Sequence, residues 1–365
     1  MALKNKVDKL TIQGFQSIRE LKDFELYDLN ILIGPNGAGK SNFINYFRML
    51  SELVEKRLQV WVKKRGGADR LLTFGVKETD VLSSRLEFGL NTYEFSLEPT
   101  NDGGFVFIDE TVSFKSAYKK DNWRSLGSGH AESQLKDSIK QQLIASDTYD
   151  SITHWKLYHF HDTSDTAGVN RLGNLIDAEY LRSDAENLAA YLYNLRENYF
   201  NVYAQIRKTV QLAIPLFDDF VLNPQTLSNG EEQIRLIWRQ KNSDYPLWPT
   251  QLSDGSIRFI CLATALLQPN PPSTIIIDEP ELGLHPYALT LLGSLIRSAS
   301  TRMQIIISTQ SVPLLNEFEI KDLIVVERED DVSVFKRLDE ADFEEWLQEY
   351  SVGELWEKNL FGGRP

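Results

Sequence analysis

A glycine-rich segment near the N-terminus has the residue types of a phosphate-binding loop. Residues 34–41 read GPNGAGKS, which matches G-x-x-x-x-G-K-[ST] at every fixed position. Glycines let consecutive backbone N–H groups turn toward phosphate oxygens, and a following helix adds partial positive charge at its N-terminus. We therefore expect ATP binding, with Lys40 reaching the β- and γ-phosphates and Ser41 binding Mg²⁺. The predicted nucleotide-binding residues of this loop are Asn36, Gly37, Ala38, Gly39, Lys40 and Ser41.

Two acidic residues end an apolar run much later in the chain. Residues 274–279 read TIIIDE. A P-loop site needs an acid at the carboxyl end of a strand to hold Mg²⁺, and Asp278 suits that position. Glu279 could accept a proton from the attacking water as the catalytic base. An apolar run ending in Asp-Glu is a weak signal alone, but it becomes strong downstream of a complete P-loop.

A third motif, LSDGS at residues 252–256, directly precedes a predicted helix. Ser253 and the backbone of Gly255 would lie at the helix N-terminus, which is a good anion site. The plainer interpretation is that Ser253 or Asp254 only caps the helix, and both roles can coexist.

The order of these motifs resembles that of the ABC ATPase superfamily, whose signature motif, usually LSGGQ, lies just upstream of the acidic strand. In that family the signature motif contacts the γ-phosphate held by the other protomer. The resemblance therefore implies a homodimer that closes on ATP and Mg²⁺, with Ser253 and Gly255 in contact with nucleotide. The following residues 281–286, ELGLHP, are similar to the D-loop region of RecF-like and OLD-type ATPases of DNA repair and phage defence.

The chain departs from the family pattern at two positions. Gln310 stands where ABC ATPases usually carry a switch histidine. Glutamine can hydrogen-bond a phosphate or a water but cannot become cationic near neutral pH. We therefore predict a catalytic role for Gln310, while the sequence leaves the rate of ATP hydrolysis undetermined. The best positional match to the Q-loop, residues 158–162, contains no glutamine. There His161 or Asp162 could contact Mg²⁺ or water, and structural histidines are the alternative.

The elements around these motifs predict an α/β fold. Residues 84–114 alternate apolar with polar or small side chains and predict an antiparallel meander. Residues 177–215 read mainly as helix, and residues 256–267 as a buried helix. Apolar runs typical of strands lie at residues 29–33, 155–160, 275–277, 305–307 and 323–326.

We therefore expect an ABC-type P-loop nucleotide-binding core with an antiparallel β lobe and a helical insertion. Residues 1–80 and 220–365 would form the core, residues 81–160 an antiparallel lobe that is part of it, and residues 161–219 the insertion.

Composition limits the partners of the chain. Lys and Arg total 39 against 52 Asp and Glu, a formal charge of −13 over 365 residues, so we expect weak DNA binding by the chain alone. Two basic clusters near the insertion are either DNA contacts or a solvated charged face. They consist of Lys56, Arg57, Lys63, Lys64, Arg65 and Arg70, and of Lys115, Lys119, Lys120 and Arg124.

No run resembles a signal peptide or a membrane helix, so we expect a cytoplasmic protein without membrane contact. The single cysteine, Cys261, lies in an apolar run and is expected to be a buried core residue.

Three functions are compatible with these observations. The first is an ATPase that dimerises on ATP and controls a separate DNA-processing or anti-phage effector, for which a Toprim-type nuclease is one candidate. The second is the ATPase subunit of a membrane transporter, and the third a non-hydrolysing ATP-dependent scaffold. Since the chain ends soon after residues 323–326, we expect no Toprim nuclease within it.

Overall fold

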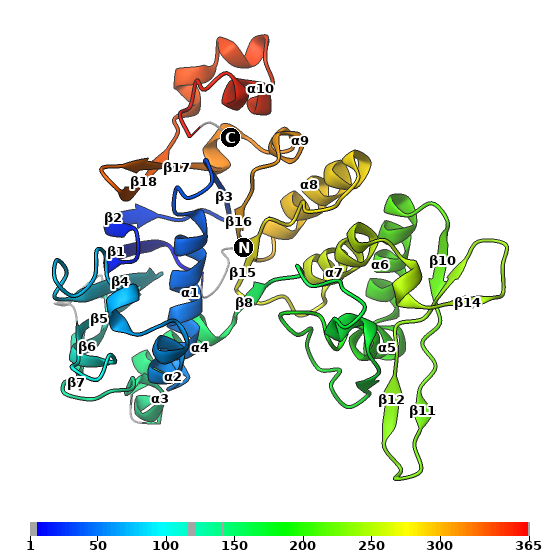
Figure 1. Ribbon diagram of the computed structural model, residues 1–365, viewed down its shortest axis with the longest axis horizontal. Coiled ribbons are helices and arrows are strands. Elements are labelled where there is room, and N and C mark those ends of the chain that lie inside the picture. The colour runs from blue at the N-terminus through cyan, green and yellow to red at the C-terminus, as the bar shows by residue number, and fades with distance from the viewer. Residues whose placement is uncertain (1–5, 116–121, 141, 364–365) are drawn as a thin grey trace.

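A parallel sheet and an antiparallel sheet enclose the first long helix. The computed structural model describes residues 6–115, 122–140 and 142–363, and Lys119 and Lys120 of the second basic cluster lie outside them. Figure 1 shows helix α1 (Lys40–Val54) between the two sheets, with α7 (Asp254–Leu267) and α8 (Pro286–Ser300) beyond the parallel sheet. The layers are therefore antiparallel sheet, helix, parallel sheet and helices.

The parallel sheet has the order β18-β17-β3-β16-β15-β8, and only its β17–β18 pair is antiparallel. Its central strands are continuous apolar runs because helices cover both faces. Ile276 and Ile306 face the core around α1, while Ile275 and Ile305 face the core that contains α7 and α8. The strands are β3 (Leu29–Ile33), β8 (Trp155–Tyr158), β15 (Thr274–Asp278), β16 (Gln304–Ser308), β17 (Leu323–Glu329) and β18 (Val332–Arg337).

The antiparallel sheet contains the meander expected from residues 84–114, in the order β2-β1-β4-β5-β6-β7. Its buried positions alternate along β4, as expected for a sheet with one face on the core. The strands are β1 (Lys9–Phe15), β2 (Ile18–Glu25), β4 (Leu82–Phe88), β5 (Asn91–Pro99), β6 (Phe105–Phe114) and β7 (Asn122–Gly127).

Three strands of the two large sheets, β1, β2 and β8, lie outside the ranges expected for them. β1 and β2, expected in the core segment 1–80, pair with the meander because β1 buries alternate residues and has only one apolar face. β8, expected in the lobe 81–160, pairs in parallel with β15 and forms one edge of the core sheet. In chain order, β1 and β2 thus belong to the lobe, β3 and the P-loop to the core, β4 to β7 to the lobe, and β8 to the core.

The region between β8 and α7 is a helical pair with two small sheets. Helices α5 (Leu188–Asn198) and α6 (Phe200–Ala213) pack on the side of α7, and two hairpins project beyond them (Figure 1). The short strands are β9 (Gly173–Asn174), β10 (Phe217–Phe220), β11 (Gln225–Thr226), β12 (Glu232–Ile234), β13 (Trp238–Gln240) and β14 (Pro246–Leu247). The remaining helices are α2 (Leu58–Lys64), α3 (Leu135–Ser138), α4 (Leu143–Thr153), α9 (Val312–Leu315) and α10 (Val352–Glu357).

Helix α7 is buried on nearly all sides, which explains its apolar sequence. Cys261 lies within it at 2% exposure, and burial raises the pKa of its thiol to about 12. The prediction of a buried core cysteine is confirmed.

The C-terminal segment returns to the core next to the P-loop. The side chain of Trp356 is fully buried, and its Nε1 donates to the carbonyl oxygen of Gly363 over 2.5 Å. The N–H of Gly363 donates to Glu327 Oε1 over 2.8 Å. A Cβ at Gly363 would lie 3.4 Å from the Cα of Gly34. The C-terminal segment therefore packs against the first glycine of the P-loop.

No helix among the described residues is both long enough and apolar enough to cross a membrane.

Candidate nucleotide-binding site

The carboxyl ends of the parallel strands place the predicted site residues along one edge of the sheet. The P-loop follows β3, the two acids end β15, and Gln310 follows β16. Asp278 is paired with Ser308 in the register of β15 and β16. Ligands of open α/β sheets commonly bind outside this edge. A cavity of about 240 Å³ lies there, lined by Asn36, Gly37, Gly39, Lys40, Ser41, Asn42, Glu279, Gln310 and Arg328.

The P-loop backbone requires glycine where it turns into α1. Gly39 is the N-cap residue of α1 with φ 117°, which L side chains rarely adopt. A Cβ there would also collide with the hydroxyl of Ser333. That hydroxyl donates to the carbonyl of Ala38 over 2.5 Å and lies 2.6 Å from the hydroxyl of Ser17. The β17–β18 hairpin, through Ser333, and the turn between β1 and β2, through Ser17, thus support the P-loop.

Lys40 points back over the loop that precedes it. Its Nζ donates to the carbonyl oxygens of Gly34 at 2.6 Å and Pro35 at 3.1 Å, and the residue is only 5% exposed. Burial lowers the pKa of Lys40, while the carboxylates of Glu279 and Asp278 oppose that shift. The ammonium group is therefore held near both acids at the cavity.

Ser41 and Asp278 form a pair that suits Mg²⁺. Ser41 Oγ donates to Asp278 Oδ2 over 3.4 Å, and the Ser308 hydroxyl donates to Asp278 Oδ1. P-loop proteins hold Mg²⁺ with such a hydroxyl and carboxylate, and phosphates and waters supply the other ligands. The part of the chain that the structure describes contains no cluster of three or more His, Cys, Asp or Glu able to hold a metal unaided. The donor set fits Mg²⁺ bound together with a nucleotide.

Glu279 has a strained backbone. Its φ is 44°, in the left-handed region, which costs a non-glycine residue on the order of 1 kcal/mol. Its N–H donates to the carbonyl of Ser308 over 2.9 Å. This turn separates the carboxylate of Glu279, which lines the cavity, from that of Asp278 next to it.

Gln310 connects the two halves of the site. Its Nε2 donates to Glu279 Oε1 at 2.6 Å and to Asn36 Oδ1 at 2.7 Å. The loop that carries Gln310 is fixed by Glu281, whose Oε1 accepts from Thr309 Oγ1 at 2.7 Å and from the Gln310 N–H at 2.8 Å. Burial raises the pKa of Glu281, and these hydrogen bonds oppose the shift.

Three residues at the site were not identified from the sequence. Arg328 lines the cavity and donates to the carbonyl of Gly37 over 3.2 Å. Asn42 donates to Ser17 Oγ over 2.6 Å, and Glu281 fixes the loop of Gln310. The acid pair followed by Pro280 and Glu281 could have indicated Glu281. No motif marks Arg328, because it is positioned by the β17–β18 hairpin.

Ser253 and Gly255 lie apart from the P-loop cavity of the same chain. Neither residue lines that cavity, and Ser253 is exposed. Ser253 Oγ accepts from the N–H of Ser256 over 3.2 Å, so it is the N-cap of α7. A Cβ at Gly255 would collide with the carbonyl of Gly283, which packs the start of α7 against the loop after the acids.

The segment after β8 occupies the position expected of a Q-loop. Tyr158 is paired with Ile277, so His161 follows close to the acids, and it lines one small hollow together with Asp278 and Glu279. Asp162 instead accepts from Ser164 N and Oγ within its own loop. The structure therefore brings His161, and not Asp162, beside the acids.

The basic clusters are partly neutralised by local acids. Lys56 pairs with Asp137 at 2.5 Å and Lys115 pairs with Glu87 at 2.8 Å. Such pairs favour the interpretation of a solvated charged face.

Comparisons with known proteins identify the family and the fold of the chain. Residues 29–316 match a family described as "AAA domain, putative AbiEii toxin, Type IV TA system". The fold is similar to that of an SMC head bound to the C-winged-helix domain of ScpA (14% identity, TM-score 0.61, 92% of this chain and 99% of that chain). It is also similar to an Smc head domain with an extended coiled coil, bound to the C-terminal domain of ScpA derived from Pyrococcus furiosus (14% identity, TM-score 0.54, 94% and 98%). No curated protein matches the sequence significantly. The fold is that of an ABC-type P-loop ATPase head.

Proposed function

The chain belongs to this AAA domain family, and we propose that it hydrolyses Mg-ATP and dimerises on ATP to control an effector protein. The observation that carries the proposal is the pair of hydrogen bonds from Gln310 to Asn36 and Glu279. They join the P-loop to the acid placed to act as base.

Each side chain at the cavity has a role in this proposal. Lys40 leaves the Gly34 and Pro35 carbonyls to bind the β- and γ-phosphates, and Ser41 and Asp278 are the residues that would hold Mg²⁺. Bound Mg²⁺ would neutralise charge on the phosphate oxygens. Glu279 takes a proton from the attacking water, whose oxygen forms the new bond to the γ-phosphorus as the bond to ADP breaks. Gln310 orients Glu279 but adds no positive charge, so we expect slow turnover.

The second half of each site comes from a partner copy in this proposal. Ser253 is exposed at the N-terminus of α7, outside the P-loop cavity of its own chain. A helix N-terminus with an exposed serine suits a phosphate brought by another molecule. Two chains would then enclose two nucleotides, each between one P-loop and the Ser253 and Gly255 of the other chain.

The effector is proposed to act in DNA repair or anti-phage defence. The family description, which names a toxin of a type IV toxin–antitoxin system, supports a defence role. The solved SMC head bound to a winged-helix domain supports the binding of a separate protein by a head of this fold. A Toprim-type nuclease is one candidate for the effector. We propose a cytoplasmic location for such a complex.

The test is the steady-state ATPase rate of Glu279→Gln. An amide cannot accept the proton, so the rate should fall at least about 100-fold, while affinity for labelled ATP stays within a few-fold. Glu344→Gln, which removes an exposed carboxylate remote from the cavity, is the matched control. An unchanged rate in Glu279→Gln would show that Glu279 is not the base. A wild-type chain that binds ATP but does not hydrolyse it would favour the alternative of a non-hydrolysing ATP-dependent scaffold.

A further inference from the structure

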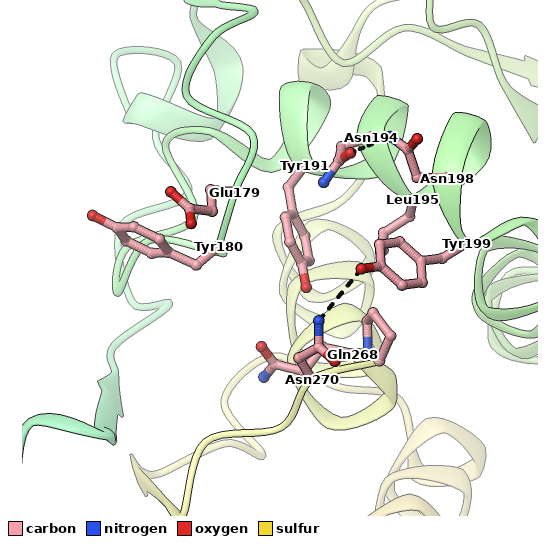
Figure 2. A pocket seen from close by; sticks show the side chains of 10 residues that line it. Glu179, Tyr180, Tyr191, Asn194, Leu195, Asn198, Tyr199, Gln268 and Asn270 are labelled. Carbon is pink, nitrogen blue, oxygen red and sulfur yellow. Dashed lines mark hydrogen bonds between the residues drawn. The ribbon is translucent and has the colours of Figure 1, made fainter. Parts of the chain in front are cut away.

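A second cavity, of about 480 Å³, lies between α5 and the loop that follows α7. Figure 2 shows Tyr191 and Tyr199 reaching from the α5 side toward that loop. The lining consists of phenols, carboxamides, one carboxylate and two apolar residues. The full lining is Glu179, Tyr180, Tyr191, Asn194, Leu195, Asn198, Tyr199, Gln268, Pro269 and Asn270.

The charge of this lining selects against anions. Glu179 is the only charged residue among the described residues that line the cavity, so the lining itself offers no cation to a phosphate or a carboxylate. The rest of the lining offers π faces and oxygen acceptors. Cations with several N–H donors match such a surface, because they bind carboxylates, amide oxygens and aromatic faces.

Two nearly buried residues each keep an oxygen that is accessible to solvent at the cavity. Tyr191 is 4% exposed, and its hydroxyl has no hydrogen-bond partner in the described part of the chain. Burial raises the pKa of this phenol, so it stays neutral. Gln268 is also 4% exposed, and its Nε2 donates to the carbonyl of Ala265 over 2.6 Å. Its Oε1 accepts no hydrogen bond from any described residue. Both oxygens are open to the cavity, so each can accept a hydrogen bond from a ligand that donates.

Aromatic rings at this cavity can stabilise a cation. Lys156 lies outside the lining, and its Nζ is 4.6 Å from the centroid of the Tyr180 ring. The ring of Tyr199, which is 40% exposed, has no cation of its own among the described residues. A planar guanidinium can stack on such a ring while its fork of donors reaches the oxygens, which an ammonium cannot do as well.

We propose that this cavity receives an arginine side chain from a partner protein. The acidic chain, with a net charge of −13, attracts a basic partner, and Glu179 places a carboxylate at the cavity. An arginine within a polypeptide fits better than the free amino acid. Free arginine also carries a carboxylate, which would meet Glu179 and find no cation in the lining.

The test uses saturation-transfer NMR with N-acetyl-arginine-methylamide as the probe and its citrulline analogue as the neutral isostere. We expect the arginine probe to bind at least about ten-fold more tightly than the citrulline analogue, because it alone makes charge-assisted hydrogen bonds. Free arginine should bind more weakly than the blocked probe. Equal binding of the arginine and citrulline probes would overturn the proposal, and tighter binding of free arginine would assign the cavity to a metabolite.

Two variants locate the binding. Glu179→Gln removes the charge and Tyr191→Phe removes only a hydroxyl. Each substitution should weaken the binding of the arginine probe several-fold. Glu197→Gln, an exposed carboxylate on α5 that does not line the cavity, should change nothing. The Lys40→Ala variant should bind the arginine probe normally. A loss of ATP binding can therefore be distinguished from a loss of arginine binding at this second cavity. Thermal unfolding checks that each variant is folded. Unchanged binding in both Glu179→Gln and Tyr191→Phe would contradict the assignment.

Discussion

Gln310 Nε2 lies 2.6 Å from Glu279 Oε1 and donates a hydrogen bond to it. The same nitrogen also donates to Asn36 Oδ1 over 2.7 Å. One neutral amide therefore connects the P-loop, at the end of β3, to the acid at the end of β15. We propose that Gln310, in place of the histidine usual in ABC ATPases, orients Glu279 without adding positive charge.

Replacing Gln310 by alanine should lower the turnover number by ten- to 100-fold, on the order of the loss of one positioned donor. Nucleotide affinity should change little, because the phosphate-binding groups stay in place. Single-turnover hydrolysis and equilibrium binding of labelled ATP separate the two effects. A variant with weaker binding and normal turnover would show that Gln310 only shapes the P-loop.

Lys40→Ala should abolish ATP binding, since it removes the cation held at the mouth of the P-loop. Lys208→Ala, an exposed lysine on α6, is the control and should bind normally. Both variants can be measured by fluorescence with a labelled ATP analogue. Normal affinity in Lys40→Ala would rule out the assignment of residues 34–41.

Ser253→Arg should bind ATP as a monomer but fail to dimerise, because bulk and charge would block the γ-phosphate of a partner copy. The substitution also removes the N-cap of α7, at a cost of about 1 kcal/mol. Ser253→Thr keeps both the cap and the hydroxyl, so it should dimerise. Light scattering with Mg-ATP compares the two, and dimerisation of Ser253→Arg would contradict a site shared between chains.

The purified chain should not cleave DNA and should bind it weakly unless a second protein is present. The net charge of −13 disfavours a polyanion, and the described residues contain no cluster of three metal-ligating side chains. Plasmid incubated with the chain, Mg²⁺ or Mn²⁺ and ATP is the measurement. Cleavage that Lys40→Ala eliminates would reveal a nuclease site in the chain.

Secondary-structure elements could be predicted from the sequence where the local residue pattern matches the way in which the element is buried in the fold. The apolar runs at 275–277 and 305–307 became β15 and β16 because a strand covered on both faces must be apolar throughout. The P-loop followed from its motif. The alternation of residues 84–114 was sufficient for β4, β5 and β6, since each strand carries one apolar face.

The expectations from the sequence differ from the structure where segments that are far apart in the chain pair with each other. β1 alternates like the lobe strands, but its position before the P-loop suggested the core. Arg328 reaches the carbonyl of Gly37 only because the β17–β18 hairpin lies beside the loop. Likewise, nothing local in residues 352–363 shows that Trp356 anchors Gly363 against β17. Contacts of this kind depend on tertiary packing and have no short-range signal.

The most direct test of the account is the mass of Glu279→Gln in solution, measured by light scattering with Mg-ATP, with Mg-ADP and without nucleotide. Blocked hydrolysis should keep ATP between two chains, so the mass should double with Mg-ATP alone and stay monomeric otherwise. Adding Lys40→Ala to the same chain should abolish the doubling. A Glu279→Gln chain that is saturated with ATP and still monomeric would contradict the ATP-closed dimer.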